Sequence, residues 1–92
     1  MATRYEIIRM NYNSKQDYKN DTPQVTKTSK VMAAESIHIL EVILETSKQR
    51  NFKPINRKNR TTIFEHQATG EYETYEIKME ERPVEWFLPS IF

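Results

Sequence analysis

The strongest structural signal in the chain is a helical pattern of apolar residues within positions 29–50. The central stripe is formed by Ala33, Ile37, Leu40 and Leu44, with Met32, Ile39 and Ile43 beside it. The pattern predicts an α-helix over residues 29–49, in which Thr28 or Ser29 caps the first turn. Lys48 lies near the carboxyl end, where the helix dipole favours positive charge. A helix with one apolar face requires a second layer of structure to cover that face.

Three other segments, residues 4–12, 61–67 and 72–80, alternate between side chains of different polarity in the manner of β-strands. The last two are predicted to form a hairpin, because their link contains Gly70, the only glycine, where a positive φ costs least. Residues 52–55 fit a short edge strand, since Pro54 cannot donate to a central ladder. We therefore predict a small two-layer α+β domain, in which one long helix packs on a mainly antiparallel sheet in the order β-α-β-β, with at most one extra short strand.

The chain of 92 residues has room for a single domain spanning 1–92. Residues 13–27 are polar and aperiodic, and they predict a long loop that is either functional or disordered. Residues 83–92 form an apolar C-terminal tail that holds the only tryptophan. Two interpretations of the tail stay open: it closes the domain's own core, or it docks on a second copy or on a partner. The docking candidates are Trp86, Phe87, Leu88 and Phe92.

Several kinds of chemistry are disfavoured by the composition. The chain has no cysteine, which removes disulfides, thiol catalysis and thiolate metal sites. Glu35 and His38 have a spacing that can share a metal ion, but a di-metal bundle would need a second such pair on another long helix. His66 is the only other histidine, and the serines lack the glycines of a nucleophile elbow. We expect no metal, no cofactor and no enzymatic activity.

Charge is segregated along the chain. Residues 1–60 hold twelve Lys or Arg and six Asp or Glu, whereas residues 61–92 hold two and seven. Most of the positive excess lies in a predicted loop over 48–60, whose candidate binding residues are Lys48, Arg50, Phe52, Lys53, Arg57, Lys58 and Arg60. This loop could contact nucleic acid, steer an acidic protein partner, or pair internally with the glutamates of the final hairpin.

Function is predicted from these surfaces. The usage of Lys, Asn, Ile, Tyr and Glu is similar to that of small proteins of low-GC bacteria, their phages and mobile elements, many of which inhibit a host protein. Our first hypothesis is a non-enzymatic interaction protein, an inhibitor or regulator that binds and occludes a host macromolecule. The alternative is a nucleic-acid-binding module that uses the 48–60 loop. We find no signal peptide or membrane-spanning segment, so we expect a cytoplasmic protein, and a homodimer remains open.

Overall fold

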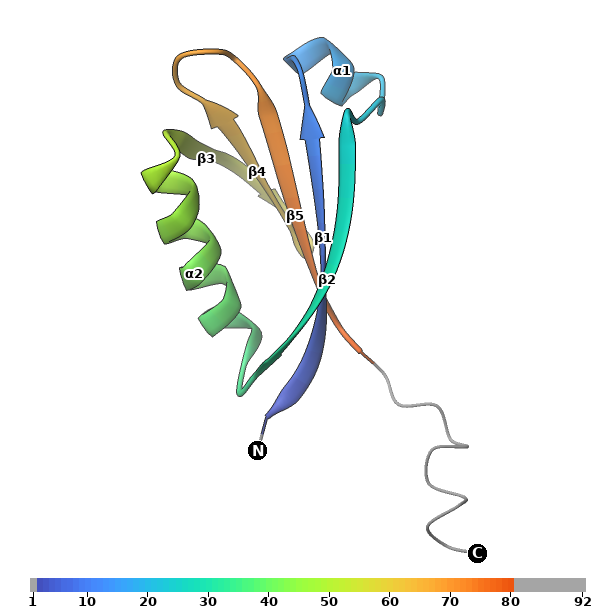
Figure 1. Ribbon diagram of the computed structural model, residues 1–92, viewed down its shortest axis with the longest axis vertical. Coiled ribbons are helices and arrows are strands. Elements are labelled where there is room, and N and C mark those ends of the chain that lie inside the picture. Colours follow the sequence, from blue (N-terminus) through green and yellow to red (C-terminus); the bar gives the residue numbers. More distant parts are fainter. Residues whose placement is uncertain (1, 81–92) are drawn as a thin grey trace, which may run out of the picture.

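The computed structural model describes residues 2–80 and forms one antiparallel sheet with two helices. In chain order the elements are β1 (Thr3–Tyr12), α1 (Lys15–Lys19), β2 (Val25–Ala33), α2 (Ser36–Gln49), β3 (Phe52–Lys58), β4 (Thr61–His66) and β5 (Tyr72–Met79). The five strands lie in the order β2-β1-β5-β4-β3 (Figure 1). The predicted α+β class and antiparallel sheet are confirmed, but the predicted β-α-β-β order is wrong. The observed order is β-α-β-α-β-β-β.

The main error concerns residues 13–33, which were predicted as a loop followed by the start of the long helix. The chain instead forms α1, capped by Ser14, whose Oγ accepts a hydrogen bond from the Asp17 amide at 3.2 Å. It then forms β2, which pairs with β1 in register from Thr3↔Ala33 to Asn11↔Val25. Most side chains of β2 are exposed, so its alternation carries little hydrophobic contrast. That weak contrast explains why the strand was missed.

Helix α2 is correspondingly shorter than predicted. It begins at Ser36 rather than at residue 29, because Ala33 belongs to β2. Its buried residues are Ile39, Leu40, Ile43 and Ser47, and Leu44 packs partly against the same core. Ile37, predicted to face the core, is 44% exposed. With the first predicted turn absent, the i, i+4 row from Ile39 to Ser47 becomes the centre of the packed face.

The predicted 48–60 loop is also wrong, because most of it is strand β3 and its turns. The strand begins at Phe52 as expected but runs to Lys58, and its pairing with β4 is irregular between Pro54 and Asn56. β3 forms one edge of the sheet in the described part of the chain, which suits Pro54. The β4–β5 hairpin is confirmed, and Gly70 has a φ of +77°.

Two hydrophobic clusters lie on opposite faces of the sheet. The larger one, between α2 and the sheet, consists of Tyr5, Ile39, Leu40, Ile43, Phe52, Phe64, Tyr75 and Ile77. The smaller one consists of Tyr12, Ile63 and Tyr72, with Met10 and Tyr18 packed against it. The ring of Tyr18, from α1, stacks on Tyr72 with a centroid distance of 5.3 Å. Burial raises the pKa of both Tyr12 and Tyr72, as expected for phenols placed in a core.

Candidate interaction surfaces

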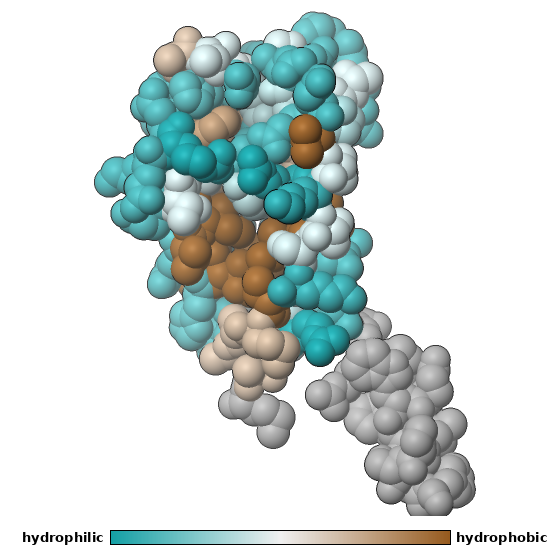
Figure 2. Space-filling view, in the orientation of Figure 1, coloured by the Kyte–Doolittle hydropathy of each residue, from teal (hydrophilic) through white to brown (hydrophobic). Residues whose placement is uncertain are grey.

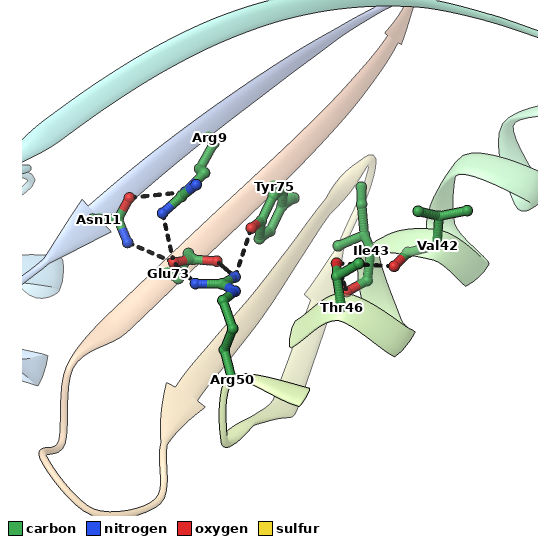
Figure 3. A network of polar contacts seen from close by, with 8 residues as sticks. All are labelled: Arg9, Asn11, Val42, Ile43, Thr46, Arg50, Glu73 and Tyr75. Carbon is green, nitrogen blue, oxygen red and sulfur yellow. Dashed lines mark hydrogen bonds and ion pairs between the residues drawn. The ribbon is translucent and has the colours of Figure 1, made fainter. Parts of the chain in front are cut away.

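A buried ionic cluster ties the end of α2 to the centre of the sheet. Its central group is Glu73 of β5 (Figure 3), and the side chain of this residue is fully buried. The Glu73 carboxylate accepts hydrogen bonds from Arg50 and Asn11 and lies 3.5 Å from the Arg9 guanidinium. Arg50 also donates to the Tyr75 hydroxyl at 2.9 Å. One carboxylate thus joins α2, β1 and β5.

The electrostatics of this cluster indicate a structural role. Burial by itself would raise the pKa of Glu73, but the hydrogen bonds and positive charge of Arg50, together with Arg9, lower it below its ordinary value of 4.5. The same pairing raises the pKa of Arg50, and burial beside the Glu73 carboxylate raises the pKa of Tyr75. The Glu73 carboxylate is therefore ionised at neutral pH and enclosed by its donors. Such a group is not free to move a proton to or from a ligand.

Two of the residues predicted to bind a partner are therefore occupied within the fold. Arg50 holds Glu73 and lies 5.0 Å from the ring centroid of Phe52. Phe52 itself is 7% exposed and belongs to the main core. The sequence left three interpretations of the cations over residues 48–60: contact with nucleic acid, with an acidic protein, or with the glutamates of the final hairpin. For Arg50, the third is observed.

The remaining cations of the run are divided between the two ends of β3. Lys48 and Lys53 lie near its beginning, whereas Arg57, Lys58 and Arg60 lie at its end and in the following turn. At about 3.3 Å per residue, Lys53 and Lys58 are about 17 Å apart along the strand. The cations that were predicted to form one binding site therefore form two separate groups, one at each end of β3.

A fourth cation joins the second group. Asn59 adopts a φ of +56° in the β3–β4 turn, and the Arg60 carbonyl accepts a hydrogen bond from the Ile77 amide at 3.1 Å. This bond places the turn beside β5, where Lys78 follows Ile77. We call this group of cations the basic end; it consists of Arg57, Lys58, Arg60 and Lys78. Lys78 was missed by sequence reasoning, because only the register of β4 on β5 brings it there.

The surface at the basic end is hollowed on both sides. Lys58, Arg60 and Lys78 line a depression of about 610 Å³ together with Tyr18 and one acidic residue, Glu76. Arg57 and Arg60 line a second hollow of about 270 Å³ with Ser36, at the start of α2. Arg60 therefore borders both hollows.

Two acidic residues, Glu73 and Glu80, form the ion pairs of the described chain, whereas Glu76, which lines the larger depression, has no ion pair among residues 2–80. The four ion pairs among residues 2–80 are Arg9–Glu73, Arg50–Glu73, Arg4–Glu80 and Lys30–Glu80. Each joins an acid of residues 61–80 to a cation of residues 1–60, and none includes a member of the basic end. The charge of the basic end is not compensated by an ion pair in this part of the chain.

An apolar groove runs between α2 and the β1–β2 side of the sheet. We call it the helix groove, and it has a volume of about 310 Å³. It is lined by Ile7, Val31, Met32 and Ala33 from the strands and by His38, Ile39, Val42 and Ile43 from the helix. Figure 2 shows hydrophobic side chains gathered on this face between α2 and the strands. Val42 is 62% exposed at its rim.

Other sites considered from the sequence do not come together. The His66 Nδ1 accepts hydrogen bonds from the Ala68 and Thr69 amides, both at 3.1 Å, so His66 shapes the β4–β5 turn. Among the described residues there is no cluster of three or more side chains suited to hold a metal ion, and no helix long and apolar enough to cross a membrane. The predicted docking residues Trp86, Phe87, Leu88 and Phe92 lie outside the described residues.

No protein-family model, curated protein or solved structure matches this chain.

Proposed function

We propose that this is a small non-enzymatic interaction protein whose basic end binds an acidic surface on a larger protein. By covering that surface it acts as an inhibitor or regulator, of the kind that phages and mobile elements direct at a host macromolecule. The observation that carries the proposal is the convergence of four cations from two hairpins at one end of the domain. None of the four has an ion-pair partner within residues 2–80.

The physical basis of such binding is long-range attraction followed by local pairing. A cluster of like charges at one end of a small molecule orients it toward an opposite charge before contact. The field extends over about 10 Å at 0.1 M salt, so the effect weakens as salt rises. Because the four cations form no ion pair with any other residue from 2 to 80, they keep their pairing capacity for the bound state.

The test is charge reversal at either end of β3. In the full chain, Lys58→Glu with Arg60→Glu changes the basic end, and Lys48→Glu with Lys53→Glu makes the same change of charge at the other end. Wild-type protein captures its partner from a nuclease-treated lysate of the host cell, and the dissociation constant of each variant for that partner is then measured. We expect at least a tenfold loss at low salt for the first variant and little change for the second. Equal affinities for all three proteins would contradict the proposal.

Nucleic acid is the second candidate, favoured by the composition of the larger depression. Lys58, Arg60 and Lys78 can contact phosphates there, and the Asn59 amide and Tyr18 ring are groups that nucleic-acid sites use. For a nucleic-acid partner, the logarithm of affinity falls linearly with the logarithm of salt concentration. Loss of Lys58 and Arg60 would reduce that slope by about 2, at nearly one per phosphate contact. Binding that disappears after nuclease treatment selects this function over the first.

A further inference from the structure

The helix groove is a part of the main core that the described residues leave uncovered. Ile7, Val31 and Ala33 pack against the buried cluster but remain partly accessible, and Val42 stands 62% exposed above them. Contiguous exposed apolar surface on a small domain marks a place where something binds. On the opposite face, α1 covers the smaller cluster with Tyr18. The helix groove has no equivalent cover within residues 2–80.

We propose that the occupant of the helix groove is the C-terminal tail of the same chain, residues 83–92, with Trp86 as its main apolar anchor. The proposal is independent of the basic end. It rests on the place where the described chain ends, on the length that follows, and on the match of apolar character.

The described chain ends close to the groove. Met79, the last residue of β5, pairs with Tyr5, and Tyr5 pairs on its other side with Val31 on the groove floor. Glu80 continues alongside β1, donating its amide to the Arg4 carbonyl at 3.0 Å, and its carboxylate lies 3.5 Å from Lys30 Nζ of β2. With neighbouring strands about 4.8 Å apart, Met79 lies about 10 Å from Val31.

The length that follows is sufficient. Twelve residues come after Glu80, and an extended chain of that length reaches about 40 Å. The tail can therefore turn back over the helix side of the sheet and still extend along the groove. Because it is covalently attached, its effective concentration at the groove is in the millimolar range, so a weak contact is enough to keep the groove occupied.

The chemistry also matches. The last ten residues include Val84, Trp86, Phe87, Leu88, Ile91 and Phe92. The groove is lined mainly by aliphatic side chains, with Met32 and His38 beside them, which suits an indole ring and branched side chains. Docking would remove from water the apolar surface of both partners at once.

Trp86 provides a direct probe, because it is the only tryptophan in the chain. We expect its fluorescence in the full-length protein to be blue-shifted relative to free N-acetyltryptophanamide and protected from acrylamide. Val42→Glu places a charge on the groove rim at an exposed position, and should shift the emission to that of solvated indole and raise quenching severalfold. The matched control is Ile55→Glu, which changes another exposed apolar residue on β3 at the far edge of the sheet. Far-UV circular dichroism verifies that both variants remain folded.

Three results would overturn the proposal. The first is a wild-type emission spectrum equal to that of solvated indole. The second is a Val42→Glu spectrum equal to the Ile55→Glu spectrum while both proteins are folded. The third is burial of Trp86 that is lost on dilution in parallel with dissociation of a dimer, which would assign the groove to the tail of a second copy.

Discussion

The cations from Lys48 to Arg60 lie close together in sequence, but those at the two ends of this segment have different surroundings in the fold. At the α2 end, Arg50 pairs with the fully buried Glu73 and becomes part of the domain's internal structure. At the β3–β4 turn, Arg60 and its neighbours form no ion pair with any residue from 2 to 80. The difference comes from β5, which places Glu73 beneath the end of α2, while Glu80 is taken by Arg4 and Lys30. Cations that look equivalent in sequence thus differ in role according to which carboxylate the sheet brings near them.

The largest expected loss of stability comes from an uncharged core residue, and it sets the scale against which the charged residues are compared. Leu40→Ala should lower the free energy of unfolding by about 2–5 kcal/mol, because Leu40 is 6% exposed and its truncation leaves a cavity under α2. Ile37→Ala, on the same helix at a 44% exposed position, should cost much less. Urea denaturation of both variants measures the difference. Equal losses would mean that the packed face of α2 is assigned incorrectly.

The next largest loss of stability is expected from breaking the ionic cluster around Glu73. Glu73→Gln removes the charge that compensates Arg50 and Arg9, and should cost about 3 kcal/mol, the low end for a broken buried pair because both arginines are partly exposed. Urea denaturation at neutral pH checks this value. A loss below about 0.5 kcal/mol would indicate that the cluster behaves like a surface ion pair.

The pH dependence sharpens the same point. Because the pKa of Glu73 is lowered in the folded state, its contribution to stability is fully present above its ordinary value of 4.5 and is lost as the pH falls through the lower folded-state pKa. The stability difference between wild type and Glu73→Gln should therefore be constant from neutral pH down to about 5 and shrink below that. Thermal unfolding over this pH series tests it. A difference that grows toward acid pH would mean that the folded-state pKa is raised.

The smallest effect is expected at the other end of the run. Arg60→Ala should change the free energy of unfolding by less than about 0.5 kcal/mol, because an exposed side chain that forms no ion pair within residues 2–80 adds little to stability. Arg50→Ala should cost about 1.5–3 kcal/mol, since it removes charged hydrogen bonds to a buried carboxylate. Comparing the two variants by urea denaturation tests the division between the ends directly. Similar losses would contradict it.

Sequence reasoning found the parts of the fold that carry strong local patterns. The β4–β5 hairpin followed from alternation around Gly70, and the helix from the spacing of Leu40 and Leu44. β2 was missed because an exposed edge strand needs no apolar alternation, and because Met32 and Ala33 happen to continue the helical spacing of α2 backward. The pattern of apolar residues therefore located the core better than it located the boundaries.

The candidate surfaces depended more on distant contacts. The cluster of cations over residues 48–60 was visible in sequence. That Arg50 pairs with Glu73, and that Lys78 joins the basic end, follow from strand register across tens of residues. The helix groove was not predicted, because it forms where the sheet extends beyond α2 on the β1–β2 side and leaves apolar side chains of these strands partly accessible. Local periodicity contains no information on how much of a sheet face a helix will cover.

The strand order also sets the time at which this domain can form during synthesis. β5 follows every other described element in the chain, yet it lies at the centre of the sheet and pairs Tyr5 with Met79. Until β5 has left the ribosome, the β1–β2 and β3–β4 hairpins cannot join into one sheet, and the strand edges that will receive β5 are open to other chains. Folding should therefore follow translation of residue 79, at the slow rates typical of long-range β pairing. Nascent chains that stop before β5 should be the aggregation-prone species of this protein.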